Sequence, residues 1–171
     1  EAGGGRDRAR GVADAGAVES EGERATRLRD VGRELLRNPV GRAAFDASKA
    51  IKAKAVELGI EEKALAATLM FAALRRLGDL VLVASYWIGD GGAALLEPES
   101  GLFHLLGEAD SGEYSGQTRF LLSQEFPRDD TWSAIDRRLR FHCVPASTVL
   151  LLMTDGVSDP KFGIDNALRD P

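Results

Sequence analysis

Two aspartates in the sequence stand where an apolar segment gives way to glycine. Asp90 follows the letters YWIG and precedes Gly91, and Asp155 follows LLLMT and precedes Gly156. A further carboxylate, Asp159, comes shortly after Asp155. A carboxylate at the end of a rigid strand has a fixed position, and the adjacent glycine lets backbone or a hydrated ion come close. Oxygen ligands from separate segments suit Mg²⁺ or Mn²⁺, although each Asp-Gly pair taken singly is more often only a turn.

A polar, glycine-containing segment, ADSGEYSGQTRF, contains the second group of candidates. The planar guanidinium of Arg119 can bind a phosphate or pair with a cleft carboxylate. The alternative is that Arg119 forms a structural salt bridge or lies exposed on a strand. Ser115 and Gln117 are predicted to lie at the rim of a cleft, because the segment is polar and supported by glycine.

No arrangement of Ser, Cys and His predicts a side-chain nucleophile. The letters GEYSG lack the spacing of a nucleophile elbow, and the two histidines, His104 and His142, form no ligand pair in the sequence. We expect both histidines to be ordinary, partly buried residues. Cys143 is expected to be a small core residue.

The elements that must position the aspartates are predicted strands. Residues 79–89 are rich in Val, Ile, Tyr and Trp, and a hairpin with residues 67–74 would satisfy their backbone. Two short strands with a turn at 98–101 follow in 91–108, which makes an antiparallel meander. Residues 118–122 read as another strand. The apolar run before Asp155 predicts a central strand buried on both faces.

Helices are predicted mainly before these strands. Apolar residues recur at helical spacing over 25–58, with a break at Asn38-Pro39 that divides the segment into two helices and a stop at Gly59. A short helix is expected over 132–139.

Composition limits the classes of function. The 171 residues are 44% hydrophobic and carry a net charge of −5, which fits one globular domain and argues against nucleic acid or a membrane as partner. A single cysteine and the lack of an apolar run of roughly 18 residues favour a reducing, cytoplasmic setting. Residues 1–24 contain no large apolar side chain and are expected to be disordered or a non-native start, with the domain covering 25–171.

Several short sequence motifs together resemble those of a known family. LLLMTDGVSDPKF is similar to the Asp-Gly motif of the PPM, or PP2C-type, metal-dependent protein phosphatases, and VASYWIGDGGAAL resembles their Gly-Asp strand and hairpin. ATL at 67–69 resembles the strand that precedes it, and LLGEADSGEYSGQTRFLL resembles a loop of a bacterial branch. The motifs occur in family order over about 66–162.

The resemblance implies a fold, a reaction and roles for particular residues. The fold would be α+β, an antiparallel β-sandwich flanked by helices, in which the segment ATLMFAAL is a strand. Asp155 would bind the main pair of Mg²⁺ or Mn²⁺ ions, Asp90 an additional weaker metal, and Asp159 would assist that weaker site. The backbone at Gly91 and Gly156 would support these ligands. The substrate would be a phosphoprotein, hydrolysed at phosphoserine or phosphothreonine by metal-activated water.

Parts of the family pattern are not matched. The opening Asp-Gly-x-Gly strand is not found, and Asp165-Asn166 follows the Asp155 motif too closely to be the closing pair. We therefore expect a domain that is incomplete at both ends, with weak or no activity by itself and with sheet edges through which it can associate.

Two alternatives remain open. One is a non-catalytic, phosphatase-like binding or regulatory module with weak or absent metal at Asp90 and Asp159. The other is a helical adaptor domain, which requires residues 66–77 to be helical, as their Ala and Leu content favours.

Overall fold

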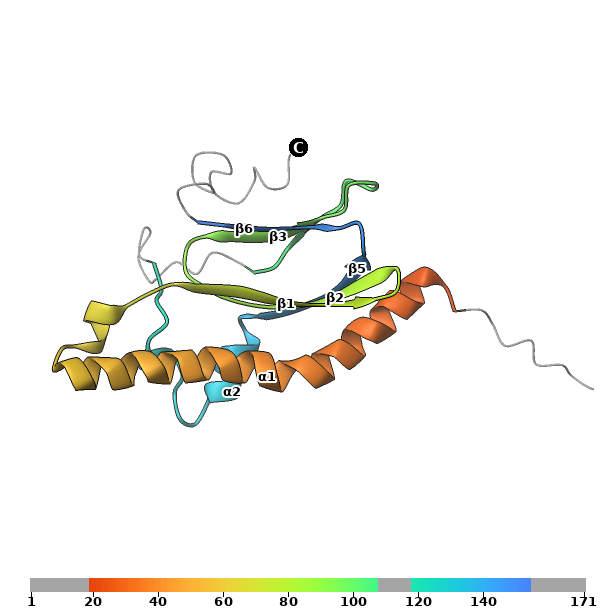
Figure 1. Cartoon of the computed structure of the whole chain (residues 1–171). Helices are drawn as coiled ribbons and strands as arrows, with labels where there is room; N and C mark the ends of the chain where they lie inside the picture. Colours follow the sequence, from red (N-terminus) through yellow and green to blue (C-terminus); the bar gives the residue numbers. More distant parts are fainter. Residues whose placement is uncertain (1–18, 108–117, 155–171) are drawn as a thin grey trace, which may run out of the picture.

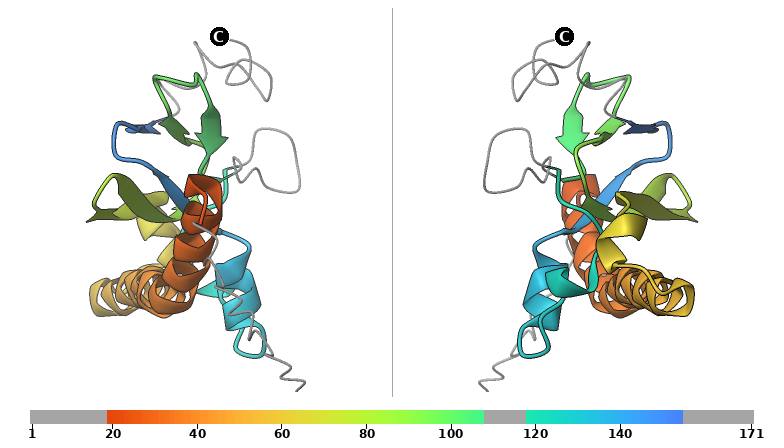
Figure 2. Two further views of the ribbon diagram at one scale, coloured as in Figure 1. Left: turned by 90° about the vertical axis from the view of Figure 1, so that its right-hand side faces the viewer. Right: turned by 90° about the vertical axis from the view of Figure 1, so that its left-hand side faces the viewer.

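The computed structural model describes residues 19–107 and 118–154, and their elements form layers (Figures 1 and 2). Sheet A, with strand order β1-β2-β5, lies between α1 on one face and sheet B, with order β4-β3-β6, on the other. The elements are α1 (Glu21–Leu58), the 3₁₀ helix η1 (Glu62–Leu65), β1 (Leu69–Leu77), β2 (Leu80–Ile88), β3 (Gly92–Leu96), β4 (Phe103–Leu105), the 3₁₀ helix η2 (Ser123–Glu125), α2 (Thr131–Asp136), β5 (Leu139–Pro145) and β6 (Val149–Met153).

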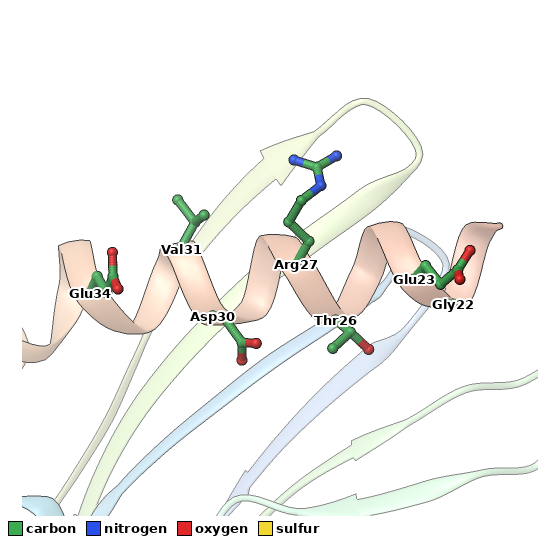
Figure 3. Close-up of a pocket in the computed structure, with 7 residues that line it drawn as sticks. All are labelled: Gly22, Glu23, Thr26, Arg27, Asp30, Val31 and Glu34. Carbon is green, nitrogen blue, oxygen red and sulfur yellow. The ribbon is translucent and has the colours of Figure 1, made fainter. Parts of the chain in front are cut away.

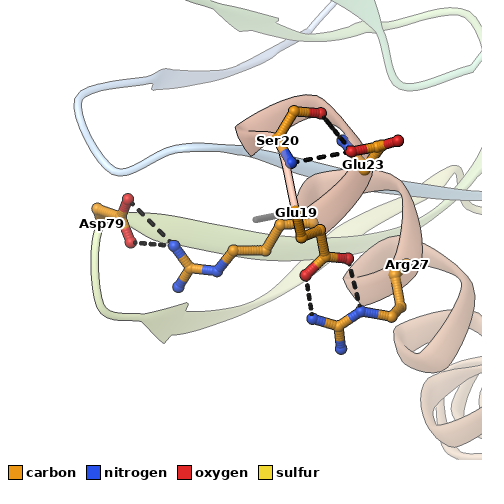
Figure 4. A network of polar contacts seen from close by, with 6 residues as sticks. Glu19, Ser20, Glu23, Arg27 and Asp79 are labelled. Atoms are coloured by element: carbon orange, nitrogen blue, oxygen red, sulfur yellow. Dashed lines mark hydrogen bonds and ion pairs between the residues drawn. The ribbon is translucent and has the colours of Figure 1, made fainter. Parts of the chain in front are cut away.

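Helix α1 begins earlier than predicted. The backbone N–H of Glu23 donates to Ser20 Oγ, and the Glu23 carboxylate accepts from the backbone N–H of Ser20 (Figure 4). This capping box starts the helix without any large apolar side chain, so the expectation of disorder is wrong for residues 21–24. Arg27 pairs with Glu19 at 2.8 Å in the same network, and Arg24 reaches Asp79 in the β1–β2 turn at 3.0 Å. Residues 1–18 lie outside the described residues.

The predicted break at Asn38-Pro39 is wrong, because α1 continues through Pro39. A proline inside a helix removes one backbone hydrogen bond and bends the helix, and Figure 1 shows that α1 is bent along its length. Val40 and Ala44 are buried just after the proline, and their packing holds the helix against sheet A. The predicted stop is confirmed, since Gly59 ends α1 with a φ of +67°.

Two glycines let α1 approach its neighbours closely. A Cβ on Gly32 would lie 2.4 Å from Leu82 Cδ1 in β2, and one on Gly41 would lie 2.6 Å from Ile135 Cγ2 in α2. The α1–α2 contact is reinforced by Arg37, whose guanidinium binds both carboxylate oxygens of Asp136. Helix α1 therefore packs closely on sheet A at Gly32 and on α2 at Gly41.

The hairpin β1–β2 is confirmed, with a tight turn at Gly78 and Asp79. Because β1 covers Leu69–Leu77, the helical adaptor alternative, which needed a helix over 66–77, is excluded. The Ala and Leu residues of this segment form a strand because pairing with β2 outweighs their local helical propensity. The two short strands after β2 are also confirmed as β3 and β4.

The predicted meander is wrong, because the chain changes sheets after β2. Residues 89–91 carry it from sheet A to sheet B, where β3 pairs with β4 and β6. The strand predicted over 118–122 is not formed: Thr118 makes an isolated bridge, and Leu121 is buried with its N–H bonded to Ala67 O at 2.8 Å. The apolar residues of this segment are thus explained by burial of a loop, and not by a strand. The short helix predicted near Trp132 is confirmed as α2.

Strand β6 does not occupy the central position predicted for it. Among the described strands it lies at one end of the order in sheet B, and its Val149 and Leu152 are 42% and 48% exposed. An apolar run shows that a strand is suited to burial, but it does not specify which neighbours cover it. By contrast, β2 is the central strand of sheet A and is buried on both faces.

The core consists of two clusters on opposite faces of β2. Ala84, Tyr86 and Ile88 pack toward α1, whereas Val83 and Trp87 pack against sheet B. This alternation follows from the two-residue period of a strand. Both clusters reach the end of β2, so Asp90 follows a rigid support. Within the described residues, no helix combines the length and the apolar character that a membrane span requires.

Candidate functional site

The end of β2, the start of β1 and the end of β6 together form a cleft of about 430 Å³. The lining combines polar residues, one with a carboxylate and several with hydroxyls, with apolar side chains. The residues that line it are Thr68, Met70, Trp87, Ile88, Asp90, Gly91, Thr118, Phe120, Met153 and Thr154. Asp90 therefore lies in a cleft.

Glycines on both sides of Asp90 allow the strand ends to meet. Gly89 has a φ of +129°, and a Cβ there would lie 2.5 Å from Thr68 Cγ2. A Cβ on Gly91 would lie 2.6 Å from the carbonyl oxygen of Met153, at the end of β6. Trp87 Nε1 donates to the Gly89 carbonyl at 3.1 Å, which fixes the turn. The predicted close approach of backbone at Gly91 is thus to β6.

Thr154, the last described residue before Asp155, lines the same cleft as Asp90. The ends of β2 and β6 therefore come to one place. Asp155, Gly156 and Asp159 themselves lie outside the described residues, and so does the Asp165-Asn166 pair, so their roles stay predictions.

A hydroxyl that the sequence did not single out contacts Asp90. Thr118 Oγ1 donates a hydrogen bond to Asp90 Oδ2, although the two residues are 28 positions apart. The only signal for Thr118 in the sequence was its place within the polar segment that resembles a family loop. Thr68 was noted only as part of the ATL motif, and it too lines the cleft.

Arg119 lies beside Glu125 rather than among the lining residues of the cleft. Its guanidinium is 3.5 Å from the Glu125 carboxylate, which also binds Arg138 at 2.9 Å. This arrangement agrees with the salt-bridge alternative, while a role in binding phosphate stays a prediction. Ser115 and Gln117 lie outside the described residues.

The donors of the cleft suit a hard cation in chemical type. The lining residues include Asp90, which carries a carboxylate, and Thr68, Thr118 and Thr154, which carry hydroxyl groups. Mg²⁺ and Mn²⁺ accept such oxygen ligands and often keep several waters. Within residues 19–107 and 118–154, no three His, Cys, Asp or Glu side chains come together as a metal site. Asp155 directly follows Thr154 of the cleft in the sequence.

The two histidines form a pair that the sequence did not predict. Their rings lie 5.6 Å apart, with His104 on β4 and His142 on β5, and His104 Nε2 is 2.8 Å from Glu97 Oε1. Burial lowers the pKa of His142 to about 4, with smaller contributions from His104, Arg29 and Arg140. The pair links sheet B to sheet A. Neither histidine is among the residues that line the Asp90 cleft.

Cys143, next to His142 on β5, is half-buried. Burial raises the pKa of its thiol. A thiol with a raised pKa is a poor nucleophile near neutral pH, in line with the expected structural role.

A second hollow lies along α1, with a volume of about 540 Å³. Figure 3 shows that its side chains spread around the helix: Arg27 and Val31 point to one side, and Thr26 and Asp30 point to the other. Arg27 is also paired with Glu19. These groups do not converge on one point, so the hollow lacks the geometry of a binding site.

The fold and the cleft define a class of protein. Two facing antiparallel sheets, with a helix across one of them and a carboxylate at a strand end, form an α+β sandwich in the described part of the chain. A family model described as protein phosphatase 2C matches residues 10–171, and the chain therefore belongs to the protein phosphatase 2C family. Comparisons with curated proteins and with solved structures gave no significant match.

Proposed function

We propose that this chain supplies the metal-dependent catalytic cleft of a protein serine/threonine phosphatase. Membership of the protein phosphatase 2C family gives a phosphatase-type function in general, with phosphoproteins as the general class of substrate. The observation that carries the proposal further is that Asp90 and Thr154, the residue before Asp155, line one cleft. Thr154 immediately precedes Asp155 in the sequence, which supports the proposal of a second metal ligand near Asp90.

The charge of the cleft supports a requirement for divalent cations. Its described lining contains one carboxylate, Asp90, and no Lys, Arg or His. A phosphoserine side chain carries nearly two negative charges at neutral pH, so Asp90 alone repels it. Asp90, Asp155 and Asp159 are the residues that would hold Mg²⁺ or Mn²⁺. The ions would lower the pKa of a bound water and neutralise the phosphoryl oxygens.

The apolar lining has its own part in this function. Met70, Trp87 and Phe120 flank the polar groups of the cleft. Apolar walls keep bulk water away and strengthen electrostatic interactions at the carboxylate. Phe120 is 38% exposed, which places part of its ring where a substrate side chain can contact it.

Calorimetry with Mn²⁺ on the 171-residue chain tests the metal site. We expect Mn²⁺ binding that is strongly weakened by Asp155→Asn and less weakened by Asp90→Asn. Asp129→Asn is the matched control, because Asp129 is an exposed aspartate in the turn before α2, and it should bind Mn²⁺ like the wild type. Release of phosphate from a phosphoserine peptide, with Mn²⁺ and with EDTA, is measured on the same samples.

The outcomes separate the enzyme from the binding module. Mn²⁺-dependent phosphate release that falls with Asp155→Asn supports the proposed function. Mn²⁺ binding without phosphate release would contradict the catalytic part of the proposal. A wild-type chain that binds no Mn²⁺ would overturn the proposed metal site and favour the non-catalytic module.

A further inference from the structure

Asp90 projects from a backbone that is fixed on both sides. The Gly89 carbonyl accepts a hydrogen bond from Trp87 Nε1, and Gly91 packs directly on the Met153 carbonyl. The peptide positions at Asp90 are therefore set by β2 and β6. The remaining freedom lies in the rotation of the Asp90 side chain, which decides where its two oxygens point.

Thr118 restricts that rotation. Its hydroxyl donates to Asp90 Oδ2, and both side chains are partly buried. A carboxylate has about four lone-pair sites, so one hydrogen bond to Oδ2 leaves Oδ1 able to bind a cation.

Thr118 is itself anchored to the sheet. Leu121 and Leu122, which follow it closely, are only 3% and 6% exposed. The Leu121 N–H donates to the Ala67 carbonyl at 2.8 Å, immediately before Thr68 of the cleft. The segment that carries Thr118 is thus attached beside the start of β1, and the hydroxyl has a defined position relative to Asp90.

We propose that Thr118 is a positioning residue that orients the Asp90 carboxylate for a divalent cation. This inference rests on the proposed function, because it concerns the same cleft. Residues that hydrogen-bond to metal ligands typically change metal affinity by about 10- to 100-fold when they are removed. Thr118 acts through Asp90 and need not touch the metal.

The test measures Mn²⁺ affinity by calorimetry on the full chain. Thr118→Val keeps the shape of the side chain and removes the hydroxyl, Thr118→Ser keeps the hydroxyl, and Thr118→Ala is a second way to remove it if the valine variant does not fold. Thr26→Val on the exposed face of α1 is the matched control. Urea unfolding in EDTA establishes that each variant is folded before metal is added.

We expect Thr118→Val or Thr118→Ala to weaken the Mn²⁺ affinity by about 10- to 100-fold, and Thr118→Ser to restore it. Thr26→Val should have no effect. In the Asp90→Asn background, Thr118→Val should cause no further loss, since Thr118 acts through Asp90.

Two results would overturn the inference while leaving the proposed function intact. One is a Thr118→Val variant that binds Mn²⁺ as tightly as the wild type. The other is an equal loss in the valine and serine variants, which would assign the effect to side-chain packing at this position and not to the hydroxyl. A wild-type chain that does not bind Mn²⁺ is a different failure, because it removes the proposed function and this inference together.

Discussion

Substitution of Gly91 by alanine tests the contact between the ends of β2 and β6. The new Cβ would lie 2.6 Å from the Met153 carbonyl oxygen and 2.9 Å from Met70 Cε, where real Cβ contacts essentially never fall below 3.0 Å. The methionine methyl group can turn aside, but the carbonyl belongs to the backbone of β6. The end of β6 must therefore move by a few tenths of an ångström.

The size of the effect follows from two opposing terms. Overpacking of this kind costs about 1–3 kcal/mol, and the reduced entropy of the unfolded chain returns about 0.4–1 kcal/mol. We expect a net loss of about 1–2 kcal/mol in the free energy of unfolding. For a chain of this length, that lowers Tm by roughly 2–8 °C.

Urea unfolding followed by tryptophan fluorescence measures this loss. Gly22→Ala is the control, because a Cβ on Gly22 meets nothing within 4 Å, and its stability should equal or slightly exceed that of the wild type. A Gly91→Ala variant as stable as the wild type would refute the close packing of the two strand ends.

The remaining predictions concern stability away from the cleft. Burial holds the pKa of His142 at about 4, below its ordinary 6.5, so the unfolded chain takes up a proton at this histidine before the folded chain does. The free energy of unfolding should therefore fall as the pH drops from 6.5 toward 4. In urea titrations, His142→Gln should make the free energy of unfolding less dependent on pH over this range. An unchanged slope would contradict the burial of this ring. Arg37 binds Asp136 through two hydrogen bonds and lies over the Trp132 ring. A double-mutant cycle with Arg37→Met and Asp136→Asn should give a coupling free energy of about 1 kcal/mol. This coupling should weaken in high salt, because both side chains are over a third exposed. Strictly additive effects at low salt would count against the pair. Ser20→Ala should cost about 1 kcal/mol by removing the N-cap of α1, and an unaltered unfolding midpoint would argue against the capping box.

The hairpins were predictable because their signals are local. Gly78 and Asp79 separate two apolar runs of matching length, and Pro98 to Gly101 mark the turn between β3 and β4. The capping box that begins at Ser20 is also a local signal, but it lies before the apolar periodicity on which the helix prediction rests. Strand β5 was not predicted, since its letters LRFHCVP carry charges among the apolar residues and give no clear period.

Long-range pairing accounts for what could not be predicted at the candidate site. An apolar strand ending in Asp-Gly was enough to predict that Asp90 stands at the end of a rigid strand. The hydrogen bond from Thr118 joins residues far apart in the chain, and the contact of His104 with His142 depends on how the sheets face each other. The edge position of β6 among the described strands likewise depends on pairing that apolar letters do not encode.

A crystal structure of the chain grown with Mn²⁺, with anomalous diffraction data, tests the central claim most directly. We predict an anomalous peak at the cleft lined by Asp90 and Thr154, with a carboxylate oxygen of Asp155 bound to the ion. Crystals that show Asp155 on the far side of the molecule, or neutralised by a lysine or arginine with no ion beside it, would contradict the account.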